Sequence, residues 1–329
     1  MMMRLFLTVV VATSVTLVVI VLRSPDLALA DGAWERVGPE GGFVWVMGIS
    51  PGFERDRTVF AGTDGGGVFR STDGGETWQK QDQGLTTRTV PTLVVSPGFE
   101  RDSTIFAGSP VGIFRSVDRG DTWVEVNKGL ENPKVLVLAI SPDFESDSTL
   151  IAGTTDGVYR STDGGDSWKA ANKGLTGALL LSLSISPTYA KDSTMFAGLV
   201  KSQVARSFGG GEFTTPTGGL FRSINGGDSW QPLEGLVDVS VLSITPSPDF
   251  FYDRMMFAGT LDDGIMRSTD GGASWQQVLG RSASPFSRAT DVTFASNGTA
   301  YAVLSRNGGG FPEYGVYRST DGGATWTSI

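Results

Sequence analysis

Acidic and amide side chains recur at one position of an octapeptide that occurs six times, and carboxylates so repeated could act as general acids, nucleophiles or cation ligands. The first copy runs from Ser71 to Trp78 and the last from Ser319 to Trp326. The chain contains no histidine and no cysteine, which excludes Ser/His/Asp and Cys/His triads and the usual zinc sites. The recurring residues are Asp73, Asp118, Asp163, Asn225, Asp270 and Asp321.

The fourth copy indicates what these side chains do. Asn225 replaces the aspartate there, and an amide keeps an acceptor oxygen while it loses the charge. Short Asp, Asn and Ser side chains commonly accept hydrogen bonds from backbone N–H groups of tight turns. We therefore predict that these six residues stabilise turns, that they are not catalytic, and that the chain holds no metal and no cofactor.

An arginine directly precedes every octapeptide. A cluster that grips one ligand must converge on one point, whereas a residue repeated once per unit is distributed evenly over a repeat array. We therefore predict that these side chains pack between units or form surface ion pairs. They are Arg70, Arg115, Arg160, Arg222, Arg267 and Arg318.

The residues between the octapeptides must supply the elements that position them. Neighbouring copies are 45 to 62 residues apart, and a period near 45 residues is typical of one four-stranded propeller blade. In the second unit, short apolar runs bounded by turn residues predict strands at 90–96, 103–108, 112–116 and 123–126. No segment after the leader shows sustained helical periodicity. The sequence thus predicts an all-β, six-bladed β-propeller of four-stranded antiparallel blades.

A seven-bladed ring is the alternative, because the segment from Trp34 to Val37 is similar to the predicted fourth strand that begins at Trp123. Such a strand from the N-terminal end could close the ring, since closure removes exposed sheet edges. It would compete with the short last strand that begins at Trp326.

The octapeptide resembles the Asp-box, or BNR repeat, of sialidases, sortilin-type receptors, xyloglucanases and Ycf48-type photosystem II assembly factors. The resemblance extends over nearly all of the chain after Ala30, because Phe-Ala-Gly strands such as 60–62 and 106–108 recur as well. It implies the same propeller fold. It does not by itself imply a function, since these families include enzymes, receptors and assembly factors.

The N-terminal region has the composition of an export signal. Residues 5–22 form an apolar run that follows Arg4 and leads to a possible processing site at 28–30. We expect residues 1–30 to be a signal peptide or an uncleaved membrane anchor, and residues 31–329 to be a single propeller domain that is secreted or tethered outside the cytoplasm. The formal net charge of −9 disfavours binding to nucleic acid or to an anionic membrane surface.

Ligand recognition is expected on the propeller face opposite the octapeptides, where the loops differ in length. Two long loops on that face contain charged and aromatic residues, and we take them as candidate ligand-binding residues. They are Arg206, Glu212 and Phe213 in the fourth unit, and Arg306, Glu313 and Tyr314 in the sixth.

Two classes of function remain open on the sequence. The first is a monomeric, non-catalytic propeller that binds a protein or a glycan, with an assembly factor as one such protein. The second is a sialidase-like or xyloglucanase-like glycoside hydrolase, which would need two positioned carboxylates or a tyrosine nucleophile. Asp64 and Tyr314 are the candidate catalytic residues for the second class. Asp64 lies in a loop similar to one that carries a catalytic aspartate in xyloglucanases.

Overall fold

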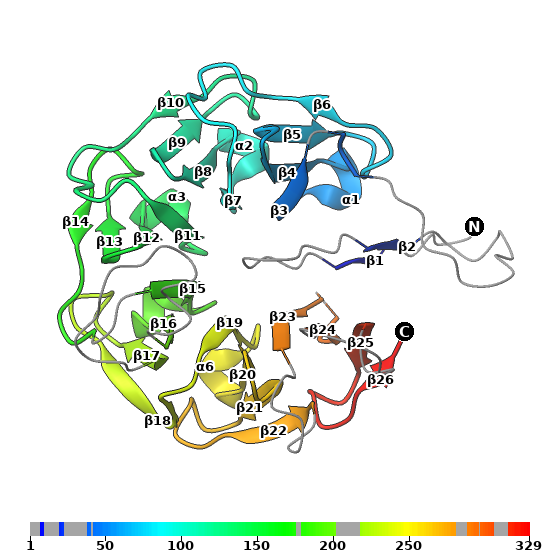
Figure 1. The fold of residues 1–329 in the computed structure, drawn as a ribbon, viewed down its shortest axis with the longest axis vertical. Coiled ribbons are helices and arrows are strands. Elements are labelled where there is room, and N and C mark those ends of the chain that lie inside the picture. The colour runs from blue at the N-terminus through cyan, green and yellow to red at the C-terminus, as the bar shows by residue number, and fades with distance from the viewer. Residues whose placement is uncertain are drawn as a thin grey trace, which may run out of the picture.

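The computed structural model describes residues 7–9, 20–22, 38–40, 42–175, 179–201, 218–280, 288–295, 297–305 and 315–329. Within these residues the chain forms six antiparallel sheets of four strands each, arranged around a centre (Figure 1). Strands within a sheet follow chain order from the innermost to the outermost strand. The predicted six-bladed β-propeller is therefore confirmed.

Each blade consists of four consecutive strands. Blade 1 contains β3 (Phe43–Ile49), β4 (Val59–Asp64), β5 (Val68–Ser71) and β6 (Gln79–Lys80). Blade 2 contains β7 (Thr92–Val95), β8 (Ile105–Ser109), β9 (Gly112–Ser116) and β10 (Val124–Glu125). Blade 3 contains β11 (Val135–Ile140), β12 (Leu150–Thr154), β13 (Gly157–Ser161) and β14 (Lys169–Ala170).

The second half of the ring repeats this order. Blade 4 contains β15 (Leu179–Ile185), β16 (Met195–Val200), β17 (Gly219–Ser223) and β18 (Gln231–Val237). Blade 5 contains β19 (Val241–Pro246), β20 (Met256–Thr260), β21 (Ile265–Ser268) and β22 (Gln276–Leu279). Blade 6 contains β23 (Arg288–Phe294), β24 (Ala300–Ser305), β25 (Gly315–Ser319) and β26 (Thr327–Ser328).

The N-terminal region contributes two further strands, β1 (Leu7–Val9) and β2 (Ile20–Leu22), which pair with each other. Figure 1 draws this pair between the first and the last blade. The predicted closing strand, residues 34–37, lies outside the described residues. No helix within the described part of the chain is both long enough and apolar enough to span a bilayer.

One helical turn follows the innermost strand in each of the first five blades. Asp102 illustrates why the chain turns there, because it accepts hydrogen bonds from the Ser96 hydroxyl at 2.5 Å and from the Thr104 N–H at 2.8 Å. The turns and the octapeptides lie on the same face of the ring, where the Gly74 N–H donates to the Arg57 carbonyl. The turns are α1 (Phe53–Asp56), α2 (Phe99–Asp102), α3 (Phe144–Asp147), α4 (Tyr189–Asp192) and α6 (Phe250–Asp253).

Apolar packing joins each blade to the next. The fully buried Phe60 of blade 1 meets Phe99 of blade 2 edge-to-face at a centroid distance of 5.7 Å. Phe106 and Phe144 repeat this contact at 5.8 Å between blades 2 and 3. Aromatic pairs of this kind contribute about 0.5–1.5 kcal/mol beyond the area that they bury.

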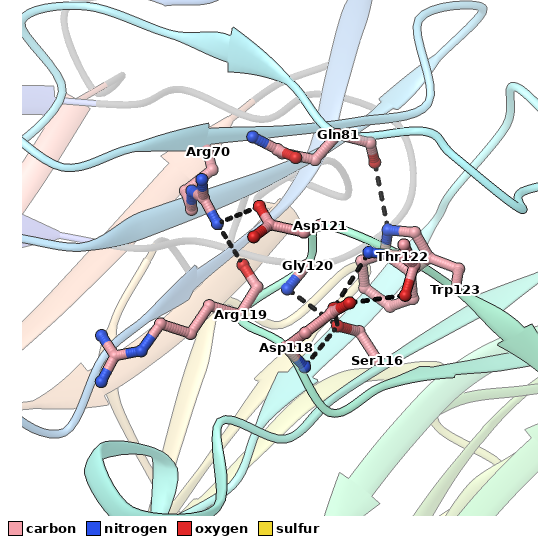
Figure 2. Close-up of polar contacts among 9 residues, drawn as sticks. All are labelled: Arg70, Gln81, Ser116, Asp118, Arg119, Gly120, Asp121, Thr122 and Trp123. Carbon is pink, nitrogen blue, oxygen red and sulfur yellow. Dashed lines mark hydrogen bonds and ion pairs between the residues drawn. The ribbon is translucent and has the colours of Figure 1, made fainter.

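Polar contacts join the same blades near the surface, and the octapeptide arginines make several of them (Figure 2). Arg70 of blade 1 donates to the Arg119 carbonyl at 2.7 Å and pairs with Asp121 at 2.8 Å, both in the octapeptide of blade 2. Arg115 contacts Gly164 and Asp166 of blade 3 in the same way. The expected role of these arginines between blades is confirmed at these positions.

In three of the octapeptides the tryptophan also bonds to the preceding blade. The Trp123 indole N–H donates to the Gln81 carbonyl at 3.1 Å (Figure 2). The Trp168 indole N–H donates to the Val126 carbonyl at 2.9 Å. Both acceptors lie directly after the outermost strand of the preceding blade, so they are not part of the hairpin that contains the tryptophan.

We predict that Trp168→Phe lowers the free energy of unfolding by about 1–3 kcal/mol, because it leaves the Val126 carbonyl without its donor in a buried site. Trp275→Phe is the matched control, since the Trp275 indole N–H donates to Gly272 within its own turn. Urea unfolding measures both. Equal losses in the two variants would show that the bond between blades adds nothing.

Candidate functional site

The octapeptide carboxylates are engaged within their own turns (Figure 2). In blade 2, Asp118 accepts hydrogen bonds from the Thr122 N–H at 2.9 Å, from the Thr122 hydroxyl at 2.5 Å and from the Ser116 hydroxyl at 2.7 Å. The Ser116 oxygen in turn accepts from the Gly120 N–H at 2.8 Å. The six turns share this pattern, so each carboxylate or amide serves one turn.

The fourth turn shows that the charge is dispensable. Asn225 accepts from the Ser229 N–H at 3.0 Å and donates its amide hydrogen to the Ser229 hydroxyl at 2.9 Å. An amide thus occupies the same geometry with one bond reversed in direction. This arrangement supports a structural role for the octapeptide residues.

The electrostatics of these turns disfavour acid catalysis. Hydrogen bonds from the Ser274 hydroxyl and N–H lower the pKa of Asp270 to about 2. A general acid needs a pKa near the working pH, which calls for the opposite shift. Within the described residues no group of three or more acidic side chains is arranged to hold a metal ion.

A cavity of about 420 Å³ lies at the centre of the ring. The innermost strand of every blade contributes to its wall, through β3, β7, β11, β15, β19 and β23. Most of the wall is apolar, with Leu136, Leu181 and Ile244 among its residues. Thr89 and Pro110 also line it, and both belong to connections on the face opposite the octapeptides.

The rim of this cavity exposes apolar side chains in blades 1 and 2. Phe43 is 42% exposed and packs edge-to-face on Trp45, which lines the cavity, at a centroid distance of 5.3 Å. Val111, next to the wall residue Pro110, is 45% exposed. Large exposed apolar groups beside an apolar cavity are typical of a binding surface.

Comparisons with known proteins agree with this architecture. A model of the family described as photosynthesis system II assembly factor YCF48 matches residues 49–187, less than half of the chain. An ancestral GH74 enzyme is 20% identical with a TM-score of 0.65, over 90% of this chain and 40% of that chain. YCF48 bound to D1 peptide is 15% identical with a TM-score of 0.61, over 88% and 82%. YCF48 from Cyanidioschyzon merolae is 19% identical with a TM-score of 0.59, over 90% and 88%.

The chain is a β-propeller of the Asp-box (BNR) type. The octapeptides, the six blades and these similarities agree on this point. Identities of 15–20% show the fold alone. This Asp-box propeller spans 40% of the length of the GH74 enzyme, and no curated protein matches its sequence.

All six ligand-binding residues predicted for the propeller lie outside the described residues. This holds for Arg206, Glu212 and Phe213 of the fourth blade and for Arg306, Glu313 and Tyr314 of the sixth. The structure does describe Asp64, which ends β4 opposite Phe43 at the cavity rim. Its carboxylate accepts a hydrogen bond from Thr89, a cavity wall residue, at 2.8 Å.

The cavity itself was missed by reasoning from the sequence. The innermost strands of five blades carry register shifts, at Trp45, Leu136, Leu181, Leu242 and Thr290. A bulge of this kind breaks the alternation that predicts which side chains face the ring centre. An alignment of the repeats on the serine that follows the innermost strand would have pointed to these residues, because Trp45, Leu136 and Leu181 each lie five positions before that serine.

We predict that Asp163→Asn lowers the free energy of unfolding of this Asp-box propeller by at most about 1 kcal/mol, because the amide oxygen still accepts from the Ser167 N–H. Asp163→Ala removes the acceptor and should cost about 1–3 kcal/mol. Urea unfolding of both variants beside the wild type measures the difference. Equal destabilisation by the two substitutions would show that the charge stabilises the turn.

Proposed function

We propose that this propeller is a non-catalytic binding protein that recognises a protein partner with its central cavity and the exposed rim of blades 1 and 2. The single observation that carries the proposal is the apolar cavity whose wall includes Thr89 and Pro110 on the face opposite the Asp-boxes, next to the exposed side chains of Phe43 and Val111. Interfaces of this kind gain affinity chiefly from apolar anchors that enter a pocket.

Two similarities support a protein partner. The family model that matches residues 49–187 describes an assembly factor, and one similar structure is YCF48 bound to D1 peptide. A role in assembly of another protein is therefore part of the proposal, while a glycan remains the other possible ligand.

A glycoside hydrolase is the competing proposal, because GH74 enzymes share the fold. Asp64 at the rim is the described candidate for one of the two carboxylates that such hydrolysis requires. Turnover of fluorogenic glycosides that is abolished by Asp64→Asn would establish this alternative and overturn the non-catalytic proposal.

Panning of a random peptide library on the protein tests partner binding. We expect the selected peptides to bind the wild type and to lose at least about tenfold in affinity to the Phe43→Ser/Val111→Ser variant, a loss of about 1.4 kcal/mol. Both residues are exposed, so the variant should fold normally.

Val117→Ser is the matched control, because Val117 is an exposed valine within an Asp-box, on the opposite face. Peptides that bind the Phe43→Ser/Val111→Ser variant as tightly as the wild type would place recognition elsewhere. If no peptide of the library binds but a glycan of an array does, the ligand is a glycan and the proposed protein partner is wrong.

We also propose that the propeller acts outside the cytoplasm, exported by the apolar segment at residues 5–22. Fractionation of expressing cells and mass measurement of the protein test this. Cleavage should give a mature protein that begins at Asp31, whereas an anchor should leave the full mass in the membrane fraction. Full-length protein in the cytoplasmic fraction would contradict export.

A further inference from the structure

We propose that the Asp-box face has a second binding surface at the junction of blades 4 and 5, which takes an acidic peptide segment of a partner protein. The Gly271 N–H donates to the Arg254 carbonyl, which places this junction on the Asp-box face. The inference goes beyond the proposed function, because it concerns the face opposite the cavity rim. We call the surface the cationic platform, and it consists of Lys191, Arg222, Phe251, Tyr252 and Arg254.

Equivalent cations at the junction of blades 1 and 2 are paired with carboxylates. Arg55 of α1 pairs with Glu100 of α2 through two hydrogen bonds. Arg70, which precedes the first octapeptide, pairs with Asp121 of the second (Figure 2). The junction of blades 2 and 3 repeats both pairs. The charge of these arginines is therefore offset within the fold and is not available to a partner.

The junction of blades 4 and 5 lacks the first of these carboxylates. Phe251 of α6 occupies the position of Glu100, and the Lys191 ammonium of α4 lies 6.0 Å from the centroid of the Phe251 ring. Lys191 forms no ion pair within the described part of the chain. A cation over an aromatic ring keeps its charge, so Lys191 can still attract an anion.

The same junction lacks the second carboxylate. Ala273 occupies the position of Asp121 in the octapeptide of blade 5. Arg222 of blade 4 therefore donates to the Gly271 carbonyl at 3.1 Å and forms no ion pair with the residues that the structure describes. Ala273 is exposed, so an aspartate would fit there as it does in blades 2 to 4.

Arg254 brings a third cation to this place. Its guanidinium lies 5.9 Å from the ring centroid of Phe250 and 5.7 Å from that of Phe251. A β-carbon on Gly271 would lie 3.7 Å from Nη1 of Arg222 and 3.9 Å from Cδ of Arg254. The two arginine side chains therefore meet beside this glycine, and an anion bound there would be attracted by both charges.

Acidic side chains on the elements that carry the cationic platform do not neutralise it. Three of them have partners of their own, and Asp249, which precedes α6, forms no ion pair among the described residues. The charges of the platform thus remain available to a ligand. The three engaged acids are Asp192 and Asp253, which accept from the Ser186 and Ser247 hydroxyls, and Asp228, which pairs with Arg160.

The aromatic side chains of the cationic platform indicate which anion fits. Tyr252 is 76% exposed and meets Phe251 edge-to-face at a centroid distance of 5.2 Å. Tyrosine and arginine are enriched among the residues that dominate protein interfaces. The carboxylates missing here are those of Glu and Asp side chains elsewhere in the ring, so an acidic peptide with apolar residues complements the platform. A short segment is also repelled less by the net charge of −9 than a second copy of the chain would be.

Titration calorimetry with capped peptides tests this binding. The acidic probe has the central sequence Glu-Leu-Asp-Leu-Glu, and the matched amide probe has Gln-Leu-Asn-Leu-Gln. We expect the wild type to bind the acidic probe at least about tenfold more tightly than the amide probe. The difference should shrink in about 0.5 M salt, because salt screens exposed charges.

Ala273→Asp restores the carboxylate that other blades have at this position. We expect it to pair with Arg222 and to weaken binding of the acidic probe about tenfold. Arg222→Gln/Arg254→Gln should weaken this binding at least as much. Arg55→Gln/Arg101→Gln is the matched control, because it removes two arginines from the same face that are already paired with carboxylates. This control should bind both probes as the wild type does.

Equal binding of the two probes, no binding of the acidic probe, no effect of Ala273→Asp, or an equal loss in the Arg55→Gln/Arg101→Gln control would overturn the inference. Wild type that self-associates in sedimentation but does not bind the acidic probe would make the cationic platform an interface between copies. Binding of a heparin oligosaccharide in place of the acidic probe would make the ligand an acidic glycan and overturn the peptide. Phe43→Ser/Val111→Ser should bind the acidic probe as the wild type does, so failure here leaves the proposed function intact.

Discussion

Contacts between neighbouring blades are the interactions on which the ring depends, and at three junctions they include a bond from an Asp-box tryptophan to the preceding blade. A four-stranded sheet cannot bury both of its faces alone, so each blade is stable only against its neighbours. The Trp168 indole and the Arg115 guanidinium reach across such junctions in opposite directions, one to the preceding blade and one to the following blade. Asp163 holds the turn from which the tryptophan projects.

Because the Asp-box contacts join the blades at the periphery, the residues at the centre of the ring can vary. The Asp-boxes lie at the periphery of one face, and the residues that line the cavity come from the innermost strands. The same strand position carries Val46, Ser182 or Asp291 in different blades without a change in the strand pairing around it. Residues under structural constraint and residues available for recognition are thus separated in space.

The carboxylates of the Asp-boxes and of the cavity wall are separated in the same way. The Asp270 carboxylate is exposed and engaged by hydroxyl and N–H donors, which keeps it ionised and local in its effect. Asp291 lies instead at the wall of the central cavity, where its carboxylate accepts a hydrogen bond from the Val292 N–H.

The sequence alone determined the blade repeat, because strand and turn propensities and the Asp-box are local properties that recur with one period. It also indicated the structural role of the Asp-box residues, because Asn225 in place of an aspartate shows that the turn needs a hydrogen-bond acceptor and not a charge. The partners of Trp123 and Trp168 were decided only by the tertiary structure, because the acceptors lie 42 residues earlier in the preceding blade. The cavity with Trp45, Leu181 and Asp291 was also decided there, since six strands far apart in the chain converge on it and the bulges in five of them change which side chains face the centre.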